Sequence, residues 1–279
     1  MKYLSLSFLV LIGFNLFVWY YAVGGGEDGL DVYFLDVGQG DSEFLVLPGG
    51  VKVLIDGGPG KEVLFELARV LRPTDRYIDL VVLSHPQLDH YAGLYDVIKR
   101  YKVGAIIWNG REGEGEAWQG FWDLIQAEEI PVITLGAEDK ISYRESLIKV
   151  LSPTRQLQQS SELNNSSLVL ELESEGAKVL FTGDAGFGVE NYLVSQYDID
   201  SDILKVGHHG SRYATGLNFL AETAPRISVI EVGENNPYGH PTSAALSRLA
   251  SVGSRVYRTD QNGTVHLEAN NGLVGVDLR

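Results

Sequence analysis

The chain has 279 residues, a net charge of −15 and no cysteine, and 44% of its residues are hydrophobic. This length and apolar content suit one large α/β domain or two small ones. The absence of cysteine excludes a disulfide framework and a thiolate metal site. The acidic balance disfavours a broad electrostatic surface for nucleic acid, which normally needs a basic stripe, but it leaves room for a local site.

The N-terminal segment, residues 4–23, carries no charged side chain and is long enough to cross a bilayer as a helix. Lys2 precedes it and Glu27 follows, so the positive-inside rule predicts an extracytoplasmic location for the rest of the chain. We expect residues 1–23 to be a transmembrane anchor, with a cleaved signal peptide and a buried core helix as alternatives. The glycine-rich residues 24–29 would then link the anchor to a catalytic domain over residues 30–279.

The first half of this domain begins with predicted strands over residues 30–37, 43–47 and 52–55, which are rich in Val, Leu and Phe. A helix over residues 61–71 follows, and the apolar run 78–83 predicts a buried strand. The apolar spacing at positions 94, 97, 98 and 101 predicts a helix. A strand over 103–108, a helix over 118–129 and strands over 132–135 and 146–151 come next. Residues 155–161 are polar and indicate a loop.

The second half repeats the pattern. Strands over 167–172 and 178–182 are joined by a turn, and helices over 188–196, 217–222 and 242–250 alternate with strands over 203–206 and 227–231. Short strands over 255–258, 263–267 and 273–277 close the chain. Strands followed by βα alternation, twice over, predict an α/β (α+β) fold in which two mixed sheets pack face to face with helices outside.

Polar side chains with metal-ligand chemistry gather just after predicted strands. Asp184 follows residues 178–182, and five of the six histidines lie at strand ends: His85, His90, His208, His209 and His240. Asp89 lies beside His90. Loops at the carboxyl ends of strands are where α/β folds build their sites. Imidazole and carboxylate together are the ligand set for zinc, manganese or iron. Helix caps and scattered surface histidines would not produce this clustering, so a metal site is expected.

The motifs that carry these residues resemble the metallo-β-lactamase superfamily, in the branch represented by the extracytoplasmic domain of ComEC-type DNA-uptake proteins. The matching segments occur in the family's order at residues 34–42 (FLDVGQGDS), 54–58 (LIDGG), 84–90 (SHPQLDH), 164–168 (NNSSL), 182–184 (TGD), 208–211 (HHGS) and 238–241 (YGHP). They extend over nearly everything after the N-terminus. The resemblance implies a four-layer αβ/βα sandwich and a hydrolase that uses one or two divalent metal ions, Zn or Mn.

The resemblance also implies roles for single residues. His85 matches a ligand of the first metal, Asp89 and His90 match ligands of the second, and Asp184 matches the bridging carboxylate. Only one of the adjacent His208 and His209 can easily point at the same metal. We assign His208 and His240 to the ligands, and Asp89, His209 and His240 to catalysis as proton donors or substrate contacts. Which of these three histidines bind metal stays open.

Two positions depart from the broader superfamily, because Gln87 and Asn165 stand where histidines are common. Oxygen donors in place of nitrogen shift the metal preference from zinc towards manganese or magnesium. Lys205, at a strand end, is expected either to face phosphate or to be solvated. His266 is expected to be a surface or packing residue.

Further residues are expected around the ligands rather than among them. Asp56 could hold a ligand histidine by its second ring nitrogen, or it could form an Asx turn. Asp36 and Asp41 flank glycines at a strand end and either shape the pocket or serve the fold alone. Ser211 follows the histidine pair and belongs to the same group.

These features predict an extracytoplasmic, metal-dependent hydrolase, most directly a phosphodiesterase or nuclease acting on DNA in competence-type uptake. The alternatives are hydrolysis of another phosphodiester, such as a choline-bearing cell-wall polymer, or of a lactone. A non-catalytic module that binds DNA or a partner is a third alternative, although Asp89, His90 and Asp184 argue against it. Because ComEC proteins also carry a multi-helix channel and this chain has at most one membrane span, an uptake role would require a separate channel protein.

Overall fold

The computed structural model of the protein describes residues 8, 10–15 and 29–278. Within these residues the strands form two mixed sheets. The first has the spatial order β15 (Leu273–Leu278), β14 (Val265–Asn270), β1 (Leu30–Phe34), β2 (Glu43–Leu47), β3 (Val51–Ile55), β4 (Tyr77–Leu83), β5 (Lys102–Trp108) and β6 (Val132–Thr134). The second has the order β13 (Arg255–Arg258), β12 (Ile227–Ile230), β11 (Ile203–Lys205), β10 (Ala177–Phe181), β9 (Val169–Ser174), β8 (Ser146–Ser152) and β7 (Lys140–Tyr143).

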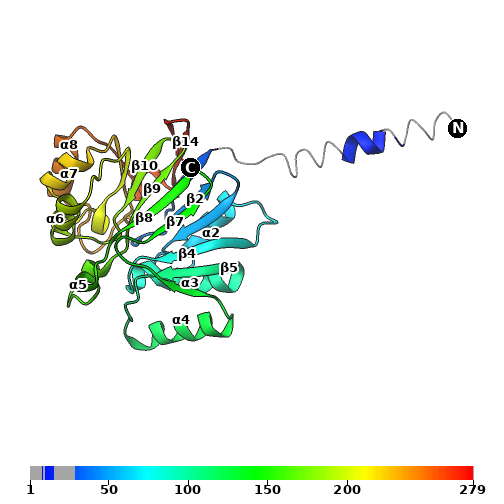
Figure 1. Ribbon diagram of the computed structural model, residues 1–279, viewed down its shortest axis with the longest axis horizontal. Coiled ribbons are helices and arrows are strands. Elements are labelled where there is room, and N and C mark those ends of the chain that lie inside the picture. The colour runs from blue at the N-terminus through cyan, green and yellow to red at the C-terminus, as the bar shows by residue number, and fades with distance from the viewer. Residues whose placement is uncertain (1–7, 9, 16–28, 279) are drawn as a thin grey trace.

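Helices cover the outer face of each sheet (Figure 1). The first sheet carries α2 (Glu62–Val70), α3 (Leu88–Arg100) and α4 (Gly115–Ala127), and the second carries α6 (Phe187–Gln196), α7 (Leu217–Thr223) and α8 (Ser243–Ser251). The connections contain the short helices α5 (Arg155–Gln158) and α9 (Thr259–Asn262) and the 3₁₀ turns η1 (Leu163–Ser166) and η2 (Gly207–Gly210). The four-layer αβ/βα sandwich expected from the sequence is thereby confirmed.

Side-chain alternation along the strands builds the layers. Leu45 and Leu47 of β2 face the other sheet, whereas Phe44 and Val46 of the same strand face the helices. In β10, Leu180 likewise packs against the helices on the outer face of the second sheet. Central strands such as β2 and β10 therefore bury side chains on both faces, and three hydrophobic clusters separate the four layers. This explains the nearly continuous apolar runs that mark these strands in the sequence.

The two sheets bring the carboxyl ends of several strands to the same edge of the sandwich. In the first sheet β3, β4, β5 and β6 run parallel to one another. In the second sheet β10, β11, β12 and β13 are also parallel. The segments that follow β3, β4, β10, β11 and β12 carry the polar residues singled out in the sequence. Polar side chains that are far apart in the chain therefore meet between the two sheets.

Three local predictions were wrong. Asp89 and His90 lie in the first turn of α3 rather than in the preceding loop, because Gln87 has extended backbone and the helix begins directly after it. Residues 155–161 do not form a simple loop, since the Thr154 side chain accepts from the Leu157 backbone N–H and caps α5. Strand β7 was missed because its side chains are exposed or only half-buried, which leaves no apolar run.

The proposed membrane anchor, residues 1–23, lies largely outside the described residues. Among the residues that the structure describes, no helix is both long enough and apolar enough to cross a membrane.

Candidate metal centre

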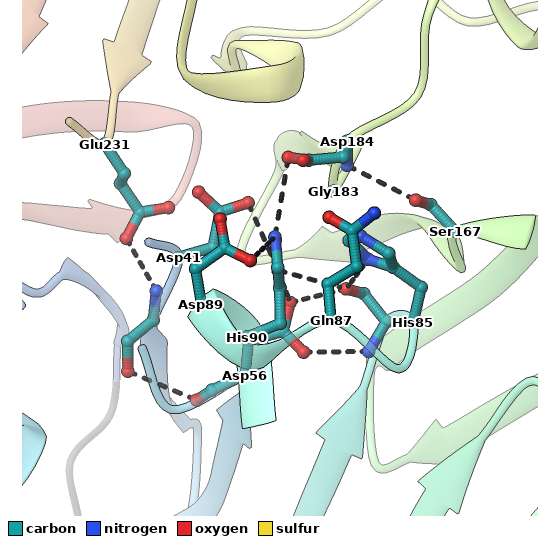
Figure 2. Close-up of polar contacts among 12 residues, drawn as sticks. Asp41, Asp56, His85, Gln87, Asp89, His90, Ser167, Gly183, Asp184 and Glu231 are labelled. Carbon is teal, nitrogen blue, oxygen red and sulfur yellow. Dashed lines mark hydrogen bonds and ion pairs between the residues drawn. The ribbon is translucent and has the colours of Figure 1, made fainter. Parts of the chain in front are cut away.

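The first part of the site is assembled at the ends of β3 and β4. Asp56 follows β3, and its carboxylate accepts from the Ser84 backbone N–H at 2.8 Å and from the Ser84 hydroxyl at 2.5 Å. Its Oδ2 lies 2.7 Å from Nδ1 of His90, in the first turn of α3 (Figure 2). The fully buried His90 ring is thus held through Nδ1, and its Nε2 is directed towards Asp184 at 3.6 Å.

The second part comes from the turn η2, in which His208 and His209 both have left-handed backbone, with φ of 48° and 52°. This unusual turn sends the two rings in different directions. The His209 side chain is buried, and its Nε2 lies 3.4 Å from Asp89 Oδ2 and 3.7 Å from Asp184 Oδ1. His208 remains 36% exposed, with its Nε2 3.7 Å from the other oxygen of Asp184. The adjacent histidines therefore meet opposite oxygens of one carboxylate.

Among the described residues, five overlapping groups of side chains have the spacing of metal ligands, and two of these groups contain two histidines each. One contains His85, His90 and Asp184, and the other contains Asp89, His90 and His209. In the part of the chain that the structure describes, four buried atoms of these two groups have no hydrogen-bond partner: Nε2 of His85, Nε2 of His90, Oδ1 of Asp184 and Nε2 of His209. Unpartnered buried polar atoms are costly unless another group satisfies them. Imidazole and carboxylate atoms that converge in this way fit divalent metal ions.

The electrostatics of the cluster also favour a bound cation. Burial alone would lower the pKa of His209, but Asp184 and Asp41 raise it to about 10. Asp184 and Asp56 likewise overcome burial and hold the pKa of His90 well above its usual range. His85 is different, because burial and the neighbouring His90 lower its pKa to about 3. The carboxylates thus stabilise positive charge at two of the three imidazoles, and a metal ion would compete with protons for them.

A fully buried lysine lies directly behind the cluster. Lys205, the last residue of β11, donates to the carboxylate of Asp41 and, at 2.9 Å, to the carbonyl of Gly183. Asp41 Oδ1 also lies 3.1 Å from Nδ1 of His209. Burial would raise the pKa of Asp41, but Lys205 and His209 outweigh it and lower the pKa to about 2. Lys205 therefore links the strand end to the backbone that precedes Asp184 and to the carboxylate behind His209.

Two buried glutamates border this ion pair. Burial and the adjacent Glu231 raise the pKa of Glu43 well above its usual range. Burial and the adjacent Asp41 raise the pKa of Glu231 to about 8, and its Oε1 accepts from the Ser42 backbone N–H at 3.0 Å (Figure 2). Sequence reasoning did not identify Glu43 or Glu231 with this site, and it expected Lys205 to face phosphate or solvent rather than to be buried behind the cluster. The available signal was a charged residue at the end of an otherwise apolar strand, as in Ile203–Lys205.

A cleft of about 450 Å³ opens onto the cluster. Its lining combines candidate ligands with apolar and aromatic side chains: Gln39, Pro59, Gln87, Leu88, Asp89, Asp184, His208, His209, Pro237, Tyr238 and His240. The His240 ring centroid lies 5.8 Å from that of His208, and its buried Nδ1 has no partner among the described residues. His208 and His240 thus line the open side of the cluster, while His85 and His90 lie at its base.

Comparison with known families identifies the superfamily to which this fold belongs. Residues 35–233 match the family described as the metallo-beta-lactamase superfamily, and this range contains the whole ligand cluster. The chain belongs to the metallo-β-lactamase superfamily.

Similar proteins add a competence context. The chain is 32% identical to ComE operon protein 3 of Bacillus subtilis, over 96% of this chain and 37% of that protein. It is 28% identical to competence protein ComA of Neisseria gonorrhoeae, over 91% of this chain and 34% of that protein. The chain thus spans little more than a third of these relatives. Among solved structures, it is similar to the metallo-beta-lactamase fold protein YhfI of Bacillus subtilis, with a TM-score of 0.58, 13% identity and coverage of 90% of this chain and 100% of that one.

Of Gln87 and Asn165, the two positions expected to depart from the broader superfamily, Gln87 borders the cluster and pairs with Asn164 rather than with Asn165. Gln87 Nε2 donates to Asn164 Oδ1 at 2.6 Å. The Asn164 amide lies 3.3 Å from His208 Nδ1 and 3.5 Å from Asp184 Oδ2. Asn165, the residue expected from the sequence, instead donates to the Ser160 hydroxyl. The metallo-β-lactamase cluster of this chain is therefore bordered by the Gln87–Asn164 amide pair.

The remaining predicted residues lie farther from the superfamily site. The Asp36 backbone N–H donates to the Thr264 hydroxyl. Burial raises the pKa of the Asp36 carboxyl; a hydrogen bond from the Gly38 backbone opposes this shift, and the charge of Glu66 adds to it. The Ser211 hydroxyl accepts from the backbone of Tyr213 and so shapes the chain after η2.

His266 is buried against Tyr33, with Nε2 2.6 Å from Asp31, which agrees with a packing residue rather than a surface one. Lys205 is neither solvated nor in the lining of the cleft, so both expectations for it were wrong.

Proposed function

We propose that the protein is a metal-dependent phosphodiesterase that acts on DNA in a competence-type uptake process. One observation carries this proposal: buried Asp184 forms one donor group with His85 and His90, and its Oδ1 also lies near His209, which neighbours Asp89. A carboxylate has lone pairs on both oxygens and can serve two cations. The names of the relatives from Bacillus and Neisseria support the DNA-uptake context.

The proposed ligand sets follow from the spacing of the donors. His85 and Asp184 would hold one ion, bordered by the Gln87–Asn164 amide pair. Asp89, His90 and His209 would hold the other, with Asp184 shared. When bound, such ions would lower the pKa of a water molecule and would stabilise negative charge on the phosphoryl oxygens. This proposal exchanges the roles expected from the sequence, in which His208 was the ligand and His209 the catalytic residue. His209 lies among the donors, whereas His208 borders the cleft.

The side chains on the open side of the cleft then position the substrate and the leaving group. His208 is partly exposed beside Asp184, and His240 lies next to it. Burial and the neighbouring His208 lower the pKa of His240, which disfavours its protonated form. We propose that His208 and His240 orient the phosphodiester and that His208 donates the proton to the leaving oxygen.

The amide pair bears on the choice of metal. Gln87 and Asn164 place amide groups rather than imidazoles beside the first ligand set, so this set has fewer nitrogen donors. Oxygen donors suit manganese and magnesium, whereas nitrogen donors favour zinc. We therefore propose that manganese supports turnover at least as well as zinc.

We further propose that residues 1–23 anchor the chain in a membrane and place the domain outside the cytoplasm. The support is the uncharged segment 4–23 with Lys2 before it. In this arrangement DNA uptake would use a separate channel protein. Protease added to spheroplasts should degrade the domain, while a domain that resists protease until the membrane is broken would exclude the external location.

The reaction is tested with the purified full chain, loaded with Mn²⁺ or Zn²⁺, on DNA and on bis(p-nitrophenyl) phosphate. We expect metal-dependent hydrolysis of both, lost on chelation and in H90A, but unchanged in D123N, which alters an exposed carboxylate on α4. Hydrolysis of bis(p-nitrophenyl) phosphate without cleavage of DNA would point to another phosphodiester. No turnover with any metal, together with tight DNA binding, would favour a non-catalytic module.

A further inference from the structure

One wall of the cleft is an aromatic side chain that the proposed chemistry does not use. Tyr238 lines the cleft and is 67% exposed. Its ring stacks on His240, with centroids 6.0 Å apart and ring planes inclined by only 21°. His240 neighbours His208, and His208 lies beside Asp184. The rings of His240 and His208 therefore lie between Tyr238 and the ligand cluster. Leu88, which is 56% exposed, lines the same cleft.

The loop that carries Tyr238 is held at both ends by one side chain. The Asn236 amide donates to the carbonyls of Gly233 at 3.0 Å and His240 at 2.7 Å. Its Oδ1 accepts from the His240 backbone N–H at 3.0 Å. Gly239 has a φ of +69°, which lets the chain turn back immediately after Tyr238. These bonds fix the loop across the position of Tyr238, so the ring is presented with little backbone freedom to lose on binding.

The charge of the chain favours a contact with nucleic acid that does not depend on net charge. With a net charge of −15, the protein has no general attraction for a polyanion. Stacking of a base on an aromatic ring does not depend on net charge and tolerates any base. Bases inside a duplex are already paired and stacked, so a ring at a cleft wall can receive only an unpaired base.

We propose that Tyr238 and His240 form a stacking subsite for an unpaired nucleobase next to the scissile phosphate, so that the substrate is single-stranded DNA or a frayed end. The inference rests on the proposed function in that it takes the substrate to be a nucleic acid. The base lies against the exposed face of Tyr238, and its phosphate points towards the ligand cluster. Discrimination against duplex DNA then comes from the cost of unpairing the base.

The subsite is tested by binding, in the absence of turnover. The purified full chain is titrated in chelator with a labelled thymidine oligonucleotide and with an abasic oligonucleotide of equal length. The two carry the same phosphates and differ only in their bases. We expect the thymidine strand to bind about tenfold more tightly. The Y238A variant should lose this difference and Y238F should keep it, because phenylalanine retains the ring.

A second tyrosine provides the matched control. Tyr213 is also 67% exposed and follows the same histidine turn, but it does not line the cleft, so Y213A should bind both oligonucleotides as the unaltered protein does. Equal binding of the two oligonucleotides by the unaltered protein, or an unchanged preference in Y238A, would overturn the subsite. The proposed function is judged separately by hydrolysis of bis(p-nitrophenyl) phosphate: base-dependent binding without hydrolysis defeats the function, and hydrolysis without base-dependent binding defeats only the subsite.

Discussion

Lys205 donates to Asp41 in a completely buried ion pair, and Asp41 in turn contacts the ring of His209. The ammonium group therefore supports the candidate metal site from behind while remaining outside the cleft. Burial alone would lower the pKa of Lys205, but Asp41, Glu43 and Asp184 raise it, so the lysine stays charged. A permanent internal cation here offsets part of the negative charge of the clustered carboxylates without occupying a ligand position.

The first prediction concerns this ion pair. K205M leaves Asp41 buried without its cation, which typically costs about 3–5 kcal/mol of unfolding free energy. The double variant D41N/K205M should recover part of this loss because no uncompensated charge remains. Denaturant unfolding measures both. The control is K178M, which removes a partly exposed pair with Asp200 and should cost less than about 1 kcal/mol. Equal effects of K205M and K178M would mean that the buried pair has no special role in stability.

The second prediction concerns Asp56, which holds the Nδ1 side of His90. D56N keeps a similar shape but removes the negative charge that orients the imidazole and raises its basicity. We expect metal affinity to fall about 10- to 100-fold, as is typical when the support of a ligand histidine is weakened. Isothermal titration with Mn²⁺ measures the change. A loss of cooperative unfolding with metal affinity intact would show that Asp56 serves the fold alone.

The third prediction separates the adjacent histidines. His209 lies among Asp89, His90 and Asp184, so H209A should lose bound metal. His208 lies on the open side of the cleft, so H208A should retain metal and lose turnover, by about 10²- to 10⁴-fold if it donates a proton. Elemental analysis and kinetics on the two variants distinguish these outcomes. Metal loss in H208A and retention in H209A would restore the roles expected from the sequence.

The fourth prediction concerns pH and a carboxyl group remote from the cluster. Glu190 of α6 accepts the backbone N–H groups of Thr215 and Gly216, and burial raises its pKa from an ordinary value of 4.5 to about 7 despite those bonds. The folded protein therefore holds this proton more tightly than the unfolded chain does. Between about pH 4.5 and pH 7 only the unfolded chain loses it, so this group lowers stability as the pH rises through that window.

The loss of unfolding free energy caused by the raised pKa of Glu190 is complete above pH 7 and amounts to about 3 kcal/mol. E190Q does not titrate, so its stability relative to the unaltered protein should improve by a similar amount between pH 4.5 and pH 7.5. Thermal unfolding across this range is the measurement. A constant difference between the two proteins at every pH would contradict the raised pKa of Glu190.

The sequence predicted the layers of the fold because apolar runs and turn residues record burial directly. It also predicted the residues that meet in the cluster, since His85, Asp89, His90 and Asp184 each follow a recognisable strand. Which of two neighbouring side chains points inwards could not be predicted. The left-handed backbone at His208 and His209 and the 3₁₀ turn at Asn164 decide that question, and neither conformation has a clear sequence signal.

The buried ion pair was missed for a related reason. A lysine at a strand end is normally solvated, and its burial depends on Asp41, which comes from a segment 164 positions away. When a buried charge is neutralised by a residue this far away in the sequence, the only local signal is a charged residue within an apolar run. The same holds for Glu43 and Glu231, whose burial is evident only when the two sheets are brought together.

The central claim is that the histidine and carboxylate cluster is a metal centre that hydrolyses phosphodiesters. It is tested most directly by titrating Mn²⁺ into the chelator-treated full chain while bound metal and hydrolysis of bis(p-nitrophenyl) phosphate are followed together. Turnover should rise with bound metal and saturate when the cluster is filled, and D184N should abolish both, because Asp184 is shared by the two proposed ligand sets. Hydrolysis that persists at full rate in the metal-free protein, or in D184N, would contradict the account.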